Sequence, residues 1–168
     1  DPMIQNRWLR SGENEYHRLS KDGMGVLDWI RRSEVPCSKM VTYPRIVVDY
    51  RPKKDEPWRT RITAGGNLLQ YNGNTTAHSA SMELIKCHIN SIISDPDARA
   101  ATADISNMYL CSDLPDNEYV RFHRSTIPQS VIDKYNIAFD GEFAYAKINK
   151  AWYGLKQAGK IANDDIIT

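Results

Sequence analysis

The sequence predicts an α+β protein in which strands and helices are mixed irregularly along 168 residues. Short β-branched and aromatic runs, such as 45–50 and 58–63, have the composition and alternation of strands. Between residues 79 and 92, apolar side chains recur every three or four positions, which is typical of one face of a helix. The length allows one globular domain or two small interleaved lobes.

Composition narrows the functional classes. Apolar residues make up 41% of the chain and charged residues 26%, as in an ordinary soluble protein. No apolar run approaches the roughly 20 residues of a membrane span, and no signal-peptide pattern opens the chain, so we expect no membrane partner. The three cysteines are widely spaced and fit no metal motif, which favours free thiols in a reducing, intracellular compartment. The two ends lead us to expect a segment of a longer protein.

Charge is unevenly distributed, although the net charge is only +1. Residues 39–63 contain seven basic and three acidic side chains, whereas residues 94–118 contain six acidic side chains and one basic. A solvated face explains either run alone. Together they suit a site that grips phosphates on one side and holds cations on the other.

The first half of the chain centres on a predicted hairpin. Residues 45–50 and 58–63 form its strands, and the polar, Pro-bounded segment 51–57 forms its turn. A period of two places Arg59 and Arg61 on one face, opposite the face of Trp58, Thr60 and Ile62. Before the hairpin, the sequence predicts one or two helices over 1–23, a strand over 26–30 and a turn over 33–36.

The second half begins with a helix capped near Ser79–Ser81, with Met82, Ile85, Ile89 and Ile92 on one face, which ends at 95–97. Next comes a predicted strand over 100–110. The remaining predicted elements are a strand at 118–122, a helix through Tyr135 with Thr126 as N-cap, a strand at 143–148, and a final helix that begins within 151–160.

Asp104 is the candidate site residue on which the interpretation centres. We expect it at the end of a buried strand, preceded by small residues and followed by Tyr109. A charge there costs several kcal/mol unless it is paired or binds a metal. Asp104 is therefore either an ion-pair partner or a metal ligand.

Three segments, in order, resemble the reverse transcriptase of copia-type long-terminal-repeat retrotransposons. They are Trp58-Arg59-Thr60-Arg61-Ile62-Thr63, Thr102-Ala103-Asp104-Ile105-Ser106-Asn107-Met108-Tyr109-Leu110 and Ala151-Trp152-Tyr153-Gly154-Leu155-Lys156-Gln157-Ala158. The last is the most specific, because Tyr-Gly-Leu-Lys-Gln-Ala is close to a family signature. The resemblance covers roughly residues 25–165 and leaves residues 1–23 unmatched.

The resemblance implies a right-hand polymerase fold, of which this chain would hold the fingers and an incomplete palm with an antiparallel sheet. It implies an N-terminal helical or linker segment at 1–23. The remaining implied parts are fingers at 24–99, a first palm strand with its following segment at 100–125, a fingers return at 126–150 and the start of a palm helix at 151–168.

The implied chemistry is nucleotidyl transfer assisted by two Mg²⁺ ions, with an RNA template, a DNA primer and deoxynucleoside triphosphates as partners. Asp104 matches the first catalytic carboxylate, and the backbone carbonyl of Ile105 would also bind metal. Tyr109 matches a sugar gate that excludes a 2′-hydroxyl.

The other implied site residues bind the nucleotide. Arg59, Arg61 or both would hold the triphosphate, because guanidinium groups pair bidentately with phosphate oxygens. Gln157 and Gly154 would line the nucleotide pocket. The structural alternatives are a strand-end salt bridge for Asp104, a core position for Tyr109, a solvent-facing strand for the arginines and a loop–helix junction around Gln157.

The family's second carboxylate pair, in an aromatic-x-Asp-Asp string, is not recognisable. Asp164 and Asp165 follow no aromatic residue and fall in the final predicted helix. We therefore expect the chain alone to be inactive and to self-associate through an exposed palm edge. Two alternatives stay open: a non-catalytic nucleic-acid-binding remnant of such an element, and an unrelated α+β domain.

Overall fold

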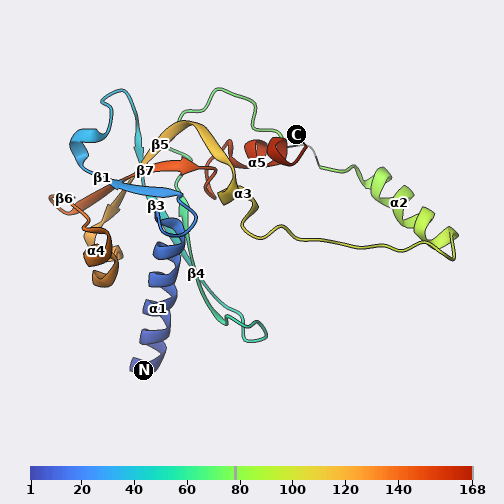
Figure 1. Cartoon of the computed structure of the whole chain (residues 1–168), viewed down its shortest axis with the longest axis horizontal. Helices are drawn as coiled ribbons and strands as arrows, with labels where there is room; N and C mark the ends of the chain where they lie inside the picture. Colours follow the sequence, from blue (N-terminus) through green and yellow to red (C-terminus); the bar gives the residue numbers. More distant parts are fainter. Residues whose placement is uncertain (78, 168) are drawn as a thin grey trace.

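The structure, a computed structural model that describes residues 1–77 and 79–167, has the predicted mixed α+β architecture. A five-stranded sheet has the order β1-β7-β5-β2, with β6 beside β7 (Figure 1). Its pairs are antiparallel except for β2 and β5, which run parallel. The strands are β1 (Leu27–Ile30), β2 (Val41–Thr42), β5 (Asp113–His123), β6 (Phe139–Asp140) and β7 (Phe143–Lys150).

The predicted hairpin is confirmed as β3 (Pro44–Tyr50) and β4 (Trp58–Ala64), with Val47 opposite Arg61 in the register. Along β4, burial alternates: Thr60 and Ile62 are buried, whereas Arg61 is exposed. This alternation follows from the pleat, which sends successive side chains to opposite faces. In Figure 1 the hairpin projects from the body beside the first helix.

That first helix, α1 (Pro2–Leu19), confirms the helical prediction for the amino-terminal segment. Asp1 caps it by accepting a 2.8 Å hydrogen bond from the backbone N–H of Met3. Its inner face buries Tyr16 and Leu19 in the core. The Tyr16 hydroxyl donates a hydrogen bond to the carbonyl of Thr126 at 3.0 Å, which links α1 to the distant segment before α4 (Gln129–Tyr135).

The main core lies where α1, β4, β5, β7 and the segment after β7 meet. Its fully buried side chains include Trp152, Phe122, Ile148 and Ile62. Burying a large apolar side chain such as Phe122 stabilises the fold by roughly 1.5–3 kcal/mol. Because Trp152 belongs to the third motif and Ile62 to the first, the core joins the two.

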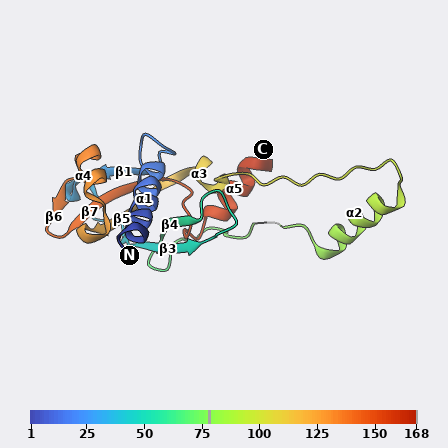
Figure 2. The same ribbon diagram turned by 90° about the horizontal axis from the view of Figure 1, so that it is seen from below.

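The helix α2 (Met82–Ser94) is confirmed in position and in its cap, because the Ser81 hydroxyl accepts a 3.2 Å hydrogen bond from Leu84 N–H. An amphipathic helix usually packs its apolar face against a core, and α2 does not. It stands away from the body in Figure 1, and Figure 2 shows the same separation. Met82, Ile85 and Ile89 are therefore exposed, and no residue of this helix is buried.

The strand predicted over residues 100–110 is wrong. Residues 100–105 have no regular secondary structure, and residues 108–111 form a short helix, α3 (Met108–Cys111). A strand needs a neighbour to pair its backbone N–H and C=O groups, and among the described strands none lies beside this segment. Its alanines also have little β-preference of their own.

The predicted N-cap at Thr126 is also wrong. Thr126 ends the 3₁₀ turn η2 (Arg124–Thr126), and its hydroxyl donates to the carbonyl of His123 at 2.7 Å. The helix α4 starts only after Pro128, because proline restricts the preceding residue, Ile127, to extended backbone.

The remaining elements are η1 (Arg32–Glu34), which overlaps the turn predicted over 33–36, and the final helix α5 (Ala158–Ile167). Asp164 and Asp165 lie inside α5, as predicted. Among the described helices, none has the length and hydropathy needed to cross a bilayer.

Candidate functional site

The exposed face of the hairpin meets the segment after β7 through Arg61 and Tyr153. The Arg61 guanidinium carbon lies 5.8 Å from the centre of the Tyr153 ring, within cation–π range. Period-two alternation on β4 points this arginine away from the core.

Tyr109 joins the same group from the other side. It lies in α3, and its ring centre is 5.3 Å from that of Tyr153, with 39° between the ring planes. This spacing is typical of packed aromatic pairs. Arg61, Tyr153 and Tyr109 thus form a continuous stack, which we call the Arg61–Tyr153–Tyr109 stack.

Gly154 brings backbone into close contact beside this stack. Its φ of +97° lies in the left-handed region that favours glycine. A Cβ at this position would lie 2.0 Å from the carbonyl oxygen of Ala64. The N–H of Ala64 donates a 2.7 Å hydrogen bond to the carbonyl of Tyr153. Only glycine fits here, because β4 and the third motif touch through their backbones.

Asp104 and Ile105 are not part of this contact group. Both are exposed and lie in the irregular segment before α3, not at the end of a buried strand. Within the described part of the chain, the Asp104 carboxylate forms no ion pair or hydrogen bond. Its desolvation cost, the premise of the sequence argument, is therefore small.

The residues described here do not make a magnesium site by themselves. Mg²⁺ needs about six oxygen ligands, commonly one or two carboxylates plus substrate phosphates and waters. Among residues 1–77 and 79–167, no three His, Cys, Asp or Glu side chains gather closely enough to hold a metal ion. The Ile105 carbonyl already accepts a 3.3 Å hydrogen bond from Met108 N–H.

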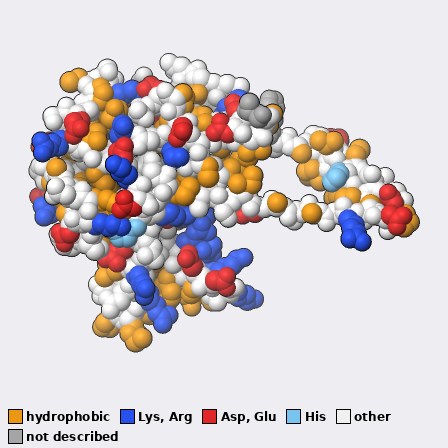
Figure 3. Space-filling model, in the orientation of Figure 1, with side chains coloured by type: hydrophobic (Ala, Val, Ile, Leu, Met, Phe, Trp, Pro, Cys, Tyr) orange, Lys and Arg blue, Asp and Glu red, His pale blue; other side chains and the backbone are white. Residues whose placement is uncertain are grey.

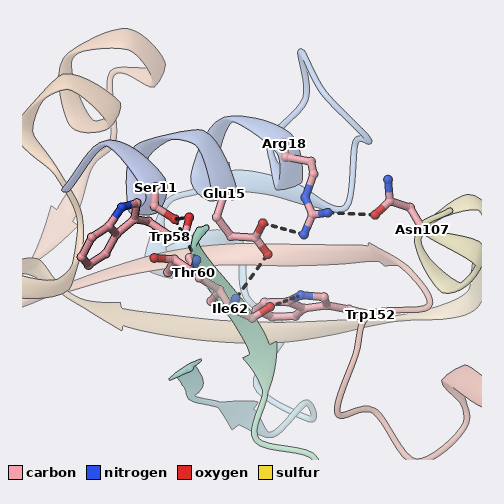
Figure 4. Close-up of polar contacts among 8 residues, drawn as sticks. All are labelled: Ser11, Glu15, Arg18, Trp58, Thr60, Ile62, Asn107 and Trp152. Carbon is pink, nitrogen blue, oxygen red and sulfur yellow. Dashed lines mark hydrogen bonds and ion pairs between the residues drawn. The ribbon is translucent and has the colours of Figure 1, made fainter. Parts of the chain in front are cut away.

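A polar chain anchors the segment that carries Asp104 to α1 (Figure 4). Asn107 adopts a left-handed conformation, with φ of 56°, at the start of α3. Its side-chain oxygen accepts a 2.8 Å hydrogen bond from Arg18, which also pairs with Glu15 at 2.5 Å. Glu15 in turn accepts from the backbone N–H of Ile62 at 3.3 Å. These four residues connect α1, α3 and β4.

Gln157 is buried, with 3% of its surface exposed. It hydrogen-bonds the carboxyl of Glu118 in β5. Burial raises the pKa of that carboxyl above its usual value. Lys39 and the Gln157 hydrogen bond oppose the shift in pKa, and Asp116 reinforces it. Gln157 lines a hollow with Glu118, whereas Arg59 and Arg61 together line another.

Of the predicted site residues, the structure brings together Arg61, Tyr109 and Gly154, with Arg59 two positions from Arg61 on the same face of β4. Asp104 and Ile105 lie just before the Tyr109 helix, and Gln157 faces a separate hollow.

Sequence reasoning missed Tyr153, Glu118 and the polar residues of α1. The signal for Tyr153 was present, since it precedes Gly154 within the motif, but residues 1–23 carried no recognisable motif at all. The comparisons add nothing to these contacts: no protein-family model, no curated protein and no solved structure matches the chain.

Proposed function

We propose that this chain is the fingers and partial palm of a reverse transcriptase of the copia type, part of a longer RNA-directed DNA polymerase. One observation carries the proposal. The three segments of the resemblance, far apart in sequence, contact one another through the Arg61–Tyr153–Tyr109 stack. Chance matches to three motifs would have no reason to converge.

In the proposed site, the deoxynucleoside triphosphate lies against this stack. Arg61, with Arg59 beside it, pairs with phosphate oxygens through its guanidinium fork. The Tyr109 ring closes the space next to the sugar, so a 2′-hydroxyl clashes. Gly154 lets backbone approach the nucleotide without a side chain between them, and Gln157 orders the adjoining loop–helix junction through Glu118.

Asp104 would supply one carboxylate toward the two Mg²⁺ ions that such polymerases use, and the Ile105 carbonyl, which also accepts from Met108 N–H, would offer its second lone pair. The remaining carboxylates would come from elsewhere in the full-length protein. The 168-residue chain is therefore proposed to be inactive alone. RNA template and DNA primer are its proposed macromolecular partners, in a reducing intracellular compartment that suits the exposed free thiols of Cys37, Cys87 and Cys111.

Primer extension tests this proposal. The chain alone should give no template-dependent synthesis, whereas the full-length protein should give synthesis that Asp104→Asn abolishes. Asp97→Asn is the matched control, because it removes an exposed carboxylate from the same stretch of chain and should leave synthesis intact. Synthesis by the chain alone would refute the proposed incompleteness, and full activity in Asp104→Asn would remove Asp104 from the site.

A second candidate function is a nucleic-acid-binding remnant without chemistry, which the basic hairpin favours. The Asp104→Asn and Asp97→Asn variants separate the two functions, because a binding module retains its affinity and has no synthesis to lose.

Self-association through an exposed palm edge stays proposed, and α2 offers a second surface for it. Met82, Ile85 and Ile89 leave an apolar helix face exposed. Light scattering that shows a monomer at high concentration would contradict this.

A further inference from the structure

A groove of about 630 Å³ runs between α1 and the β3–β4 hairpin, apart from the Arg61–Tyr153–Tyr109 stack. Its lining combines one face of the helix with the turn and first residues of β4. In Figure 3 the Lys and Arg side chains gather over the helix and hairpin below the body. The arginines of the lining are Arg7, Arg10, Arg18, Arg51 and Arg59, and its aromatic residue is Trp58.

Hydrogen bonds fix the two walls relative to each other. The Ser11 hydroxyl donates to the carbonyl of Trp58 at 3.0 Å and accepts from the N–H of Thr60 at 2.8 Å. One turn further, Glu15 accepts from Ile62 N–H. Figure 4 shows these contacts following β4 along the helix. Because the backbone of β4 is held at successive positions, the groove is preformed and does not depend on a ligand to assemble it.

Positive charge dominates the lining, with five arginines against three carboxylates. The Glu15–Arg18 ion pair offsets one charge of each sign and leaves four lining arginines against two carboxylates. Arg51 also lies 3.7 Å from Asp49, outside the lining. Burial lowers the pKa of Arg59, and the positive charges of Arg61, Arg51 and Arg18 lower it further. These guanidinium groups therefore repel one another. An anion in the groove relieves this repulsion.

The arrangement of the arginines suits a chain of phosphates. Arg7, Arg10 and Arg18 recur on one face of α1, and Arg7 to Arg18 spans about 16 Å at the helical rise per residue. Trp58 adds an aromatic surface, held by Trp8 at 4.9 Å and Tyr50 at 4.6 Å between ring centres. Guanidinium groups beside aromatic rings are the usual composition of single-strand binding surfaces.

We propose that this groove binds a single-stranded nucleic acid, with its phosphates on the arginines of α1 and the hairpin and a base against Trp58. An acidic peptide offers carboxylates to the same arginines but no flat base for the indole. Arg59 lines both this groove and the hollow that holds Arg61, so a strand in the groove runs toward the stack. The proposal does not depend on polymerase activity, since binding requires neither nucleotide nor metal.

Fluorescence anisotropy with a labelled single-stranded oligonucleotide of about 12 nucleotides tests it. Arg7→Gln/Arg10→Gln should weaken binding at least about tenfold at low salt and reduce the slope of log affinity against log salt by about 1.4, at roughly 0.7 per lost phosphate contact. Both arginines are exposed, so the fold should persist, as circular dichroism would verify. The matched control is Lys53→Gln/Lys54→Gln, which removes two charges from the hairpin turn outside the groove.

The predicted outcome is weak binding for the arginine pair and near-normal binding for the lysine pair. Equal loss of affinity in the two double variants would contradict binding in the groove, because it would show that only the net charge of the protein matters. Poly-glutamate that competes as well as the oligonucleotide would overturn the nucleic-acid assignment. Both results stand whether or not the full-length protein polymerises.

Discussion

The indole N–H of Trp152 donates a 2.8 Å hydrogen bond to the backbone carbonyl of Ile62, and both residues are fully buried. This bond ties the start of the third motif to β4 of the hairpin. The backbone N–H of Ile62 donates a hydrogen bond to the carboxylate of Glu15 in α1. Residue 62 is thus the point at which helix, hairpin and third motif are joined.

Trp152→Phe should destabilise the protein by about 2–4 kcal/mol. The change leaves a cavity and a buried carbonyl without its donor. Urea denaturation measures the loss. Trp8→Phe, at a half-buried ring on α1, is the control and should cost clearly less. Equal costs would show that the Trp152 hydrogen bond contributes little.

Gly154→Ala should destabilise by more than the roughly 1–3 kcal/mol that left-handed backbone alone costs a non-glycine residue. The added Cβ also meets the carbonyl of Ala64 at 2.0 Å. Gly141→Ala separates the two effects, because Gly141 has a φ of +58° but no atom within 4 Å of the added Cβ. A thermal melt in which both variants lose equally would argue against the close contact.

The raised pKa of Tyr16 predicts that the protein loses stability at alkaline pH. Burial raises its pKa to about 12, and the hydrogen bond to Thr126 opposes this only partly. The folded protein therefore holds this proton more tightly than the unfolded chain, whose tyrosines titrate near pH 10. The free energy of unfolding should fall as pH rises from about 10 toward 12.

Tyr16→Phe should remove that alkaline slope while costing about 1 kcal/mol at neutral pH through the lost hydrogen bond. Denaturation curves at several pH values supply both quantities. An unchanged slope in the variant would assign the alkaline loss to another group.

The raised pKa of Glu118 predicts that the free energy of unfolding also falls with rising pH in the acid range. Its raised pKa means that the folded state retains a proton that the unfolded chain releases near pH 4.3. Stability from this group is complete below that value and is lost as pH rises through the raised pKa. Glu118→Gln keeps a neutral partner for Gln157, so it should flatten this slope and make the protein more stable at neutral pH. Lower stability of the variant at pH 7 would contradict the shift.

Hydrogen exchange should distinguish α2 from the sheet. A helix of 13 residues without packing is marginal in water. Amides of residues 86–94 should therefore exchange far faster than those of Ala144, Ala146 and Ile148 in β7, which lie in the core. Comparable protection in a dilute monomer would show that α2 packs against the body.

Local chemistry made much of the fold predictable. The alternation in β4, the Pro-bounded turn and the Ser81 cap all depend on neighbours within a few residues, and all are confirmed. The strand at 100–110 depended on partners elsewhere, and local composition could not supply them. The same limit applies to the Thr126 cap, where the restriction imposed by Pro128 overrides a hydroxyl in a plausible position.

The residues of the candidate site likewise divide into those that the sequence identified and those that it misplaced or missed. Arg61, Tyr109 and Gly154 were identified from motifs and do contact a common neighbourhood. Asp104 was placed by assuming a buried strand, and its carboxylate is exposed. The arginines of α1 were not identified, because their grouping becomes visible only when the helix lies against β4.

Nucleotide selection by the full-length protein tests the central claim most directly, since it asks whether the stack meets the sugar. Tyr109→Ala should raise the ratio of ribonucleotide to deoxynucleotide incorporation by about tenfold or more, equivalent to about 1.4 kcal/mol, whereas Tyr109→Phe keeps the ring and should keep the ratio. A ratio that stays the same in Tyr109→Ala, in an enzyme that still extends primers, would contradict the nucleotide site proposed for this stack.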